Sequence, residues 1–175
     1  MNEVLPMSSI TDKLTKLEIE PVRGDDFEPF SHAQIAEIEK IIGTKLPRDY
    51  QHFLAQFGHA MFAEEVSCTS LTNPIWFGTF FSFDQLVKTI DAKIEVLPET
   101  LIPIGGDGGG NLFCLGVKGD DLGRVYFHNH SIGWHADAER LSEAGEMVPP
   151  DIRYQTVIKI ADTFEQFIHN MEKER

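Results

Sequence analysis

The stretch FHNHSIGWHAD has the residue types best suited to chemistry, because it holds three histidines and an aspartate. His128 and His130 would share one face of a strand, and His135 with Asp137 could complete a metal site. The alternative is that the histidines lie at a strand end and in its turn, hydrogen-bonded or solvated. Spacing alone permits many such sites, and no pattern of supporting ligands accompanies it. We therefore expect no bound metal.

The stretch LIPIGGDGGGNLFCLGV places five glycines within Gly105–Gly110. A dinucleotide-binding loop needs G-x-G-x-x-G before a helix, whose N-terminus holds the pyrophosphate. If Gly106 and Gly108 are the first two glycines of this motif, the third must stand at position 111, which is Asn111. The residues that follow predict a strand instead of a helix. No lysine is near that could complete a Walker loop. We expect no cofactor. The glycines are predicted to supply positive φ angles and close backbone approach, in a turn to which Asp107 is also suited.

No serine or cysteine of the chain stands in the context of a catalytic nucleophile. Cys68 and Cys114 lie far apart in apolar surroundings, which indicates reduced, buried thiols rather than a disulfide. The carboxylate pairs of the sequence alternate in direction or lie in turns, and they are expected to be solvated. The sequence therefore predicts a protein that is not an enzyme.

The charge of the chain is its most distinctive compositional property. Its 175 residues suit one domain, and 28 acidic against 15 basic residues give a formal net charge of −13. Such a field repels phosphate backbones and attracts basic proteins, although acidity can also serve solubility alone. No apolar stretch is long enough for a membrane span, and the N-terminus does not resemble a secretory signal. We expect a cytoplasmic protein that binds neither nucleic acid nor membrane.

Four amphipathic helices are predicted from apolar residues that repeat every three or four positions. Ser31 and Gln34, for instance, form a capping-box pattern at the start of the first helix. The helices are expected over residues 31–42, 47–57, 82–97 (or from 84) and from Asp162 to 171. Their buried faces are expected to carry Ile35, Ile38, Ile41 and Ile42, then Tyr50, Phe53, Leu54 and Phe57, then Leu86, Val87, Ile90 and Ile94, and last Phe164, Phe167, Ile168 and Met171.

Five strands are predicted between these helices, at MFAEEVSCT, IWFGTFF, NLFCLGV, GRVYFHNH and TVIKI. Helices at both ends with strands grouped between them indicate a single-domain α+β fold with a mainly antiparallel sheet. Residues 131–155 combine two consecutive prolines with many acids and little periodicity, so they are expected to form a long surface excursion. Trp76 is expected in the core, whereas Trp134 is either buried or an exposed anchor for a partner.

Several segments together resemble the SUKH immunity-protein superfamily, which includes fungal cell-wall synthesis regulators of the Smi/Knr type. The segment IAEIEKIIGTKLPRDYQHFLAQFG is similar to the opening of that family, and LIPIGGDGGGNLFCL to its middle. The resemblance spans about residues 31–170 and is weakest over 131–155, so we expect an N-terminal extension over 1–30 and a SUKH-like domain over 31–175. The family-motif residues are Gly43, Leu46, Pro47, Tyr50, Phe53, Leu54, Gly58, Pro103, Gly110 and Phe113.

The resemblance implies a non-enzymatic module that binds a cognate protein toxin and neutralises it. The acidic surface could then occupy a groove that a nuclease or another basic toxin uses for its phosphate substrate. The residues expected to contact the partner are Glu64, Glu65, Asp107, Asp120, Asp121, Trp134, Asp137 and Glu139. Two alternatives stay open: a regulatory or scaffolding protein of the Smi/Knr type, and a metal-dependent hydrolase built on His128, His130 and His135.

Overall fold

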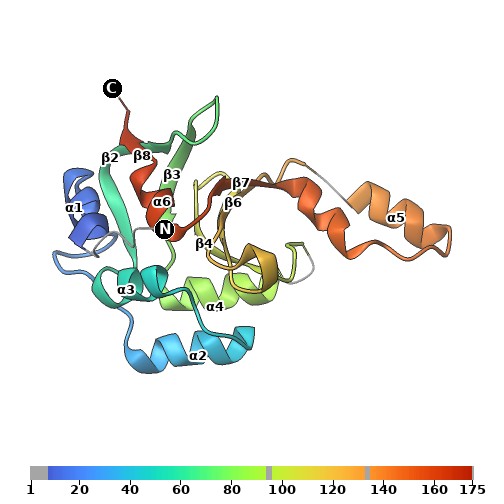
Figure 1. The fold of residues 1–175 in the computed structure, drawn as a ribbon, viewed down its shortest axis with the longest axis horizontal. Coiled ribbons are helices and arrows are strands. Elements are labelled where there is room, and N and C mark those ends of the chain that lie inside the picture. Colours follow the sequence, from blue (N-terminus) through green and yellow to red (C-terminus); the bar gives the residue numbers. More distant parts are fainter. Residues whose placement is uncertain (1–7, 94–95, 133–134, 175) are drawn as a thin grey trace, which may run out of the picture.

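A computed structural model of the chain describes residues 8–93, 96–132 and 135–174, without the side chains of residues 8, 135–138 and 150–151 (Figure 1). The chain order is α1 (Ser8–Lys16), β1 (Ile19–Pro21), α2 (His32–Ile42), α3 (Arg48–Gln56), β2 (Ala60–Cys68), β3 (Ile75–Phe80), α4 (Phe83–Ala92), β4 (Leu101–Gly106), β5 (Leu112–Gly116), the 3-10 helix η1 (Gly119–Asp121), β6 (Val125–His128), α5 (His135–Glu143), the 3-10 helix η2 (Pro150–Thr156), β7 (Val157–Ala161), α6 (Phe164–His169) and β8 (Met171–Lys173).

Within the described ranges, eight strands form one antiparallel sheet in the order β1-β2-β3-β4-β5-β6-β7, with β8 added on β2. Helices α2, α3 and α4 lie together below the sheet in the view of Figure 1. The α+β fold with an antiparallel sheet is thus confirmed. No helix among the described residues has the length and apolar character required to cross a membrane.

The main core is built from aromatic rings of the sheet and of two helices. Phe53 of α3 lies with its ring centroid 4.4 Å from that of Phe80 on β3 and 5.3 Å from that of Phe164 on α6. Phe113 of β5 packs against Phe167 of α6 at 5.6 Å. Each of these five side chains is at most 2% exposed, so α3 and α6 are fixed to the sheet by ring packing.

Strand β5 is buried on both faces, because successive side chains of a strand point to opposite sides. Phe113 and Leu115 join the main core, whereas Leu112 and Cys114 join a second, smaller cluster with Tyr126. The middle of the sheet is therefore covered on both sides, which explains the continuous apolar run that predicted this strand.

Helices α2 and α4 each begin with a capping box. The Ser31 hydroxyl accepts from the Gln34 backbone N–H at 3.2 Å and the Gln34 side chain accepts from the Ser31 N–H at 2.9 Å, as the capping-box pattern predicts. The last helix differs from expectation, because Thr163 caps it in place of Asp162. It also ends earlier than predicted, since Met171 lies in strand β8, which pairs with β2.

Two apolar residues expected in the core are exposed, and both predictions were wrong. Trp76 is 44% exposed, because its neighbour Phe77 on β3 takes the inward position and is only 2% exposed. Ile41 is 47% exposed, while Ile38 and Ile42 are buried. With about 100° between successive helix residues, Ile41 stands at the edge of the apolar stripe of α2 rather than on it.

The glycine stretch has the structural role that was predicted. Gly105 and Gly106 lie in β4, where a Cβ on Gly105 would stand 2.6 Å from the carbonyl oxygen of Thr79. Gly108 and Gly110 have φ angles of 76° and 106° in the turn to β5. The glycines therefore admit close strand contact and a left-handed turn.

Residues 129–156, here called the arm, leave the sheet after β6 and return to it at β7. Figure 1 shows the arm projecting away from the rest of the molecule. The arm covers the residues 131–155 that were predicted as a surface excursion, and it contains helix α5 and the 3-10 helix η2. Helix α5, with the sequence HADAERLSE, holds two alanines, two glutamates, one leucine and one arginine, whose helix propensity requires no apolar stripe. At the other end of the chain, Leu14 of α1 and Leu17 are buried in the main core.

Candidate protein-binding site

Asp121, one of the acidic residues expected to contact a partner, is buried and only 7% exposed. Its carboxylate accepts hydrogen bonds from the hydroxyls of Thr100, Tyr126 and Tyr154, each at 2.5 Å. Burial alone would raise the pKa of Asp121, but these donors and the nearby Arg124 outweigh it and hold the pKa below its ordinary value. The carboxylate is occupied by three donors inside the protein, which does not support the prediction that Asp121 contacts a partner.

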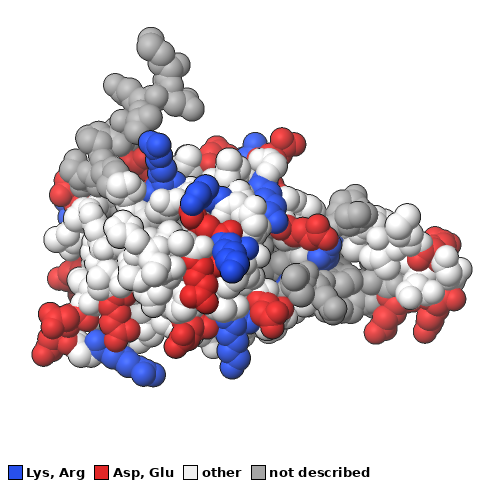
Figure 2. Space-filling view, turned by 90° about the horizontal axis from the view of Figure 1, so that it is seen from below, with Lys and Arg blue, Asp and Glu red and all other residues white. Residues whose placement is uncertain are grey.

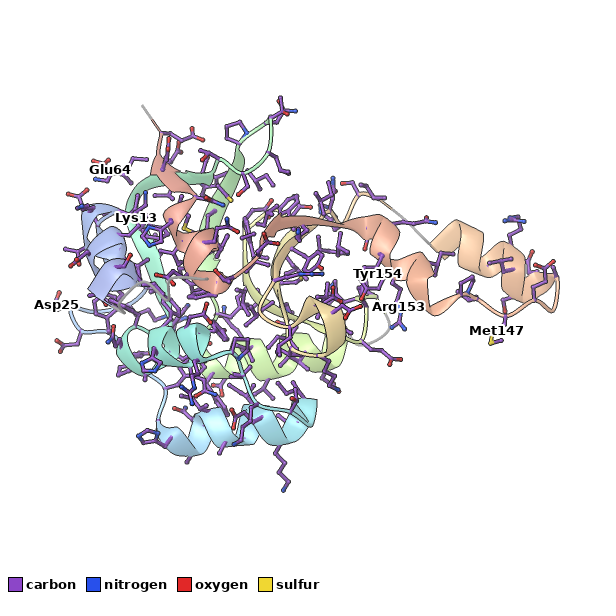
Figure 3. All side chains as sticks on the ribbon, viewed as in Figure 1. Lys13, Asp25, Glu64, Met147, Arg153 and Tyr154 are labelled. Carbon is purple, nitrogen blue, oxygen red and sulfur yellow. The ribbon has the colours of Figure 1, made fainter. Side chains whose placement is uncertain are left out.

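The hydrogen bonds at Asp121 also fix the base of the arm, because Tyr154 belongs to η2, the last part of the arm before β7. Arg153 Nη1 donates to the carbonyl oxygen of Leu97 at 3.0 Å, and Arg153 Nη2 lies 3.5 Å from a carboxylate oxygen of Glu99. Figure 3 shows Arg153 and Tyr154 where the arm joins the domain. The arm is therefore attached by side-chain bonds as well as by its two chain connections.

The outer part of the arm is acidic and exposed. Glu139, Glu143 and Glu146 are exposed, and Met147 beside them is 87% exposed. Figure 2 shows acidic side chains at the far end of the arm, and Figure 3 shows Met147 well away from the domain. The arm sequence holds five acidic and two basic residues. Of the predicted contacts with described side chains, Glu139 is the one that the structure places on this surface.

Glu64 and Glu65 lie on β2, where both are exposed. A Glu64 carboxylate oxygen is 3.3 Å from Lys173 Nζ of the neighbouring strand β8. Figure 3 shows Glu64 at the end of the molecule opposite Met147. The predicted acidic contacts therefore do not form one continuous surface.

Asp107 and Asp120 lie in two separate turns. The Asp107 carboxylate accepts from the backbone N–H of Gly109 at 2.8 Å and from the Asn111 side-chain amide at 2.6 Å, so it shapes the β4–β5 turn. Asp120 is exposed in η1. Trp134 and the side chain of Asp137, the remaining predicted contacts, lie outside the described residues.

The histidines of the candidate metal site occupy different environments. His128 is 2% exposed, and its Nδ1 is buried without a hydrogen-bond partner. Burial, reinforced by Lys93 and His130, lowers the pKa of His128 to about 4. His130 is exposed, with its Nδ1 2.8 Å from Asn111 Oδ1, and the His135 side chain lies outside the description. The described residues hold no cluster of three or more potential metal ligands.

Both cysteines are buried and unpaired in the described structure. Burial raises the pKa of the Cys114 thiol far above its usual range, so the thiol stays protonated near neutral pH. A protonated, buried thiol is a poor nucleophile. The structure thus favours a packing role for Cys114, as the sequence predicted.

The sequence matches a known protein family over most of its length. The model of the SMI1 / KNR4 family (SUKH-1) matches residues 29–170. The chain belongs to this family. Its similarity to a curated protein extends over nearly the whole chain: the SPbeta prophage-derived uncharacterized protein YokK of Bacillus subtilis (strain 168) is 24% identical over 192 residues, which cover 97% of this chain and 88% of that relative.

The residues that carried the SMI1/KNR4 resemblance build the fold rather than a reactive centre. Tyr50, Phe53 and Leu54 are buried on α3, and Gly43 ends α2 with a φ of 72°. A Cβ on Gly58 would lie 2.0 Å from the carbonyl oxygen of Glu28. Core and turn residues of this kind specify the family fold but leave the binding partner undetermined.

Sequence reasoning missed a groove between the C-terminal ends of α2 and α4 and strand β4, with a volume of about 280 Å³. Ile41 and Ile90 belong to its lining. One signal was present in the sequence, because Ile41 stands at the edge of the helical stripe, where a side chain can face a groove instead of the core.

Proposed function

We propose that this protein is an immunity protein, which neutralises a toxin of the same cell or its siblings by stoichiometric binding and catalyses no reaction itself. The observation that carries the proposal is the acidic arm that stands out from the domain on a fixed base (Figures 1 and 3). Membership of the SMI1/KNR4 family supports it, since immunity proteins are found in the SUKH superfamily. The prophage origin of one relative is in keeping with a gene carried for competition between cells.

The exposed end of the arm suits a basic partner. Carboxylates of Glu139, Glu143 and Glu146 would occupy the positions in a toxin's cationic groove that a phosphate substrate otherwise fills, as expected for a nuclease. Long-range attraction between this surface and a basic toxin would accelerate the encounter. Met147 beside the carboxylates supplies apolar area that a purely ionic contact lacks.

The fixed base of the arm lowers the cost of binding. A segment that is already ordered loses less conformational entropy when a partner immobilises it. Tyr154 and Arg153 hold the base through Asp121, Leu97 and Glu99. The proposed binding surface is therefore presented before the partner arrives.

The test uses the polypeptide encoded by the neighbouring reading frame, since an immunity protein must be made together with its toxin. We expect a one-to-one complex by calorimetry whose affinity falls as salt rises, because screening weakens exposed ionic contacts. The triple variant Glu139→Lys, Glu143→Lys, Glu146→Lys should lose at least about tenfold in affinity, mostly through slower association.

The matched control makes the same change in net charge at the opposite end of the molecule. Asp12, Asp25 and Asp26 are exposed, and Figure 3 shows Asp25 far from the arm. Their triple exchange to lysine should leave the affinity within about threefold of the parent. Equal losses in both triple variants would show that only net charge matters. Absence of any complex would instead favour a regulatory role of the Smi/Knr type.

A further inference from the structure

The groove at the ends of α2 and α4 has an apolar lining with two lysines. Its volume of about 280 Å³ lies at the lower end of the usual range for pockets that hold a small-molecule ligand. Ile41, Ile42, Ile90 and Leu97 supply apolar surface. A space of this size and composition suits one or two aliphatic side chains inserted from a larger partner.

The charge of the lining is opposite to that of the protein as a whole. Lys93 and Lys118 line the groove, and neither makes a side-chain ion pair within the described part of the chain. The lining also holds Glu99, but a carboxylate oxygen of Glu99 lies 3.5 Å from Arg153 Nη2. Two lysines that make no ion pair among the described residues therefore belong to the lining of an apolar groove, on a chain of net charge −13.

The exposure of Ile41 is the second observation. Its side chain is 47% exposed although it stands on a helix whose neighbouring positions Ile38 and Ile42 are buried. Figure 2 views the molecule from the side of α2 and α4 and shows basic side chains over the middle of this face, with acidic side chains between them. An apolar groove with charged side chains among its lining residues matches the apolar centre and polar rim of a protein interface.

We propose that this groove binds an acidic, aliphatic peptide segment of a partner protein. A leucine, isoleucine or methionine of that segment enters between Ile41 and Ile90, and flanking aspartates or glutamates meet Lys93 and Lys118. This site goes beyond the proposed function, because it selects for acidic segments, whereas the arm selects for a basic surface. A negative result for the groove therefore does not affect the proposal for the arm, and a negative result for the arm does not affect the proposal for the groove.

The test measures binding of fluorescein-labelled peptides to the full chain by polarisation. The probes are EELLEE, its basic counterpart KKLLKK and its small-residue counterpart EEAAEE. We expect EELLEE to bind at least about tenfold more tightly than either counterpart, because both the anchor and the charge are needed. KKLLKK also detects binding to the acidic arm, because a basic peptide is attracted to the arm and does not need the groove.

Matched variants locate the binding site. Ile41→Glu and Lys118→Glu should each weaken binding of EELLEE by about tenfold. Ile158→Glu alters a residue of identical exposure, 47%, on β7, and Lys88→Glu alters an exposed lysine on α4 outside the groove lining. Both controls should bind EELLEE within about twofold of the parent. Circular dichroism melting of all four variants establishes that they are folded.

Three results would overturn the proposal. Equal binding of EELLEE and EEAAEE would show that the apolar floor is not used. Equal effects of Ile41→Glu and Ile158→Glu would show that the peptide lies elsewhere. A concentration-dependent dimer of the parent chain that Ile41→Glu abolishes would assign the groove to a second copy of the protein.

Discussion

The hydroxyl of Tyr154 donates to Asp121 Oδ2 at 2.5 Å, which joins the arm to the 3-10 helix that follows β5. Tyr154 is 37% exposed, whereas Asp121 is 7% exposed. The hydrogen bond therefore joins a buried carboxylate of the domain to a partly exposed side chain of the arm. Asp121 contributes both to the stability of the domain and to the attachment of the arm.

Replacing Tyr154 by phenylalanine should loosen the arm without unfolding the domain. Asp121 keeps the hydroxyls of Thr100 and Tyr126, so the loss in unfolding free energy should be about 1 kcal/mol. Limited proteolysis within residues 129–156 should become faster. Tyr126→Phe is the matched control, because it removes one donor from the same carboxylate but lies in β6; it should lower stability without accelerating cleavage of the arm. Equal cleavage in both variants would argue against a role of Tyr154 in attachment.

His128 should make stability fall in mildly acidic solution. Its pKa is lowered to about 4 in the folded state, chiefly by burial, whereas an unfolded histidine titrates near 6.5. The unfolded chain therefore binds more protons between these values, so the stabilisation present above about pH 6.5 is lost as pH falls toward 4, by on the order of 2 kcal/mol. Urea unfolding at pH 7, 6, 5 and 4 measures this slope. His128→Phe should flatten it, while replacement of the exposed His32 by alanine should not; an unchanged slope in His128→Phe would contradict the assignment.

The glycine stretch predicts unequal effects of the same substitution. Gly105→Ala places a Cβ 2.6 Å from the backbone oxygen of Thr79, so the strands must separate, at a cost of about 2 kcal/mol or more. Gly109→Ala meets its nearest neighbour, Asp107 Oδ1, at 3.4 Å and should cost less than about 1 kcal/mol. Urea titrations of the two variants compare these costs. Similar losses at both positions would refute the close approach of β3 and β4.

Trp76 and Phe77 are neighbours on β3 that face opposite sides of the sheet. Trp76→Ser should lower the unfolding free energy less than Phe77→Ser does, because the Trp76 side chain is 44% exposed and Phe77 is 2% exposed. Phe77→Ser should cost about 3 kcal/mol or more, because its ring contacts Phe80 and Phe113 in the core. Thermal melts of the two variants give the order of stability, and a larger loss for Trp76→Ser would mean that the strand is turned over.

The elements that could be predicted from sequence are those defined by near neighbours along the chain. Ser31 with Gln34, and Ser82 with Gln85, are each three residues apart, so both helix starts can be located from local chemistry. The glycine turn is equally local. Helix α5 escaped prediction because it lacks an apolar stripe, and strand β8 because three residues carry too little pattern.

The candidate site was harder to predict, because it depends on residues far apart in the sequence. The sequence around Asp121 predicts a solvated acid in a turn. In the fold, hydroxyls of Thr100, Tyr126 and Tyr154, which are distant from one another in the sequence, donate to its carboxylate. The exposure of Ile41 likewise depends on what lies beyond the edge of one helix. Composition indicated an acidic surface, but only the arrangement of the chain shows that Glu64 and Glu139 stand on separate surfaces.

Growth of cells that produce the polypeptide of the neighbouring reading frame tests the proposed neutralisation most directly. We predict that this polypeptide alone stops growth and that co-expression of the parent chain, or of the Asp12, Asp25 and Asp26 control, restores it. The variant with lysine at positions 139, 143 and 146 should fail to restore growth although it is folded and present in equal amount. A neighbouring polypeptide that is harmless, or rescue by the arm variant as complete as by the parent, would contradict neutralisation through the arm.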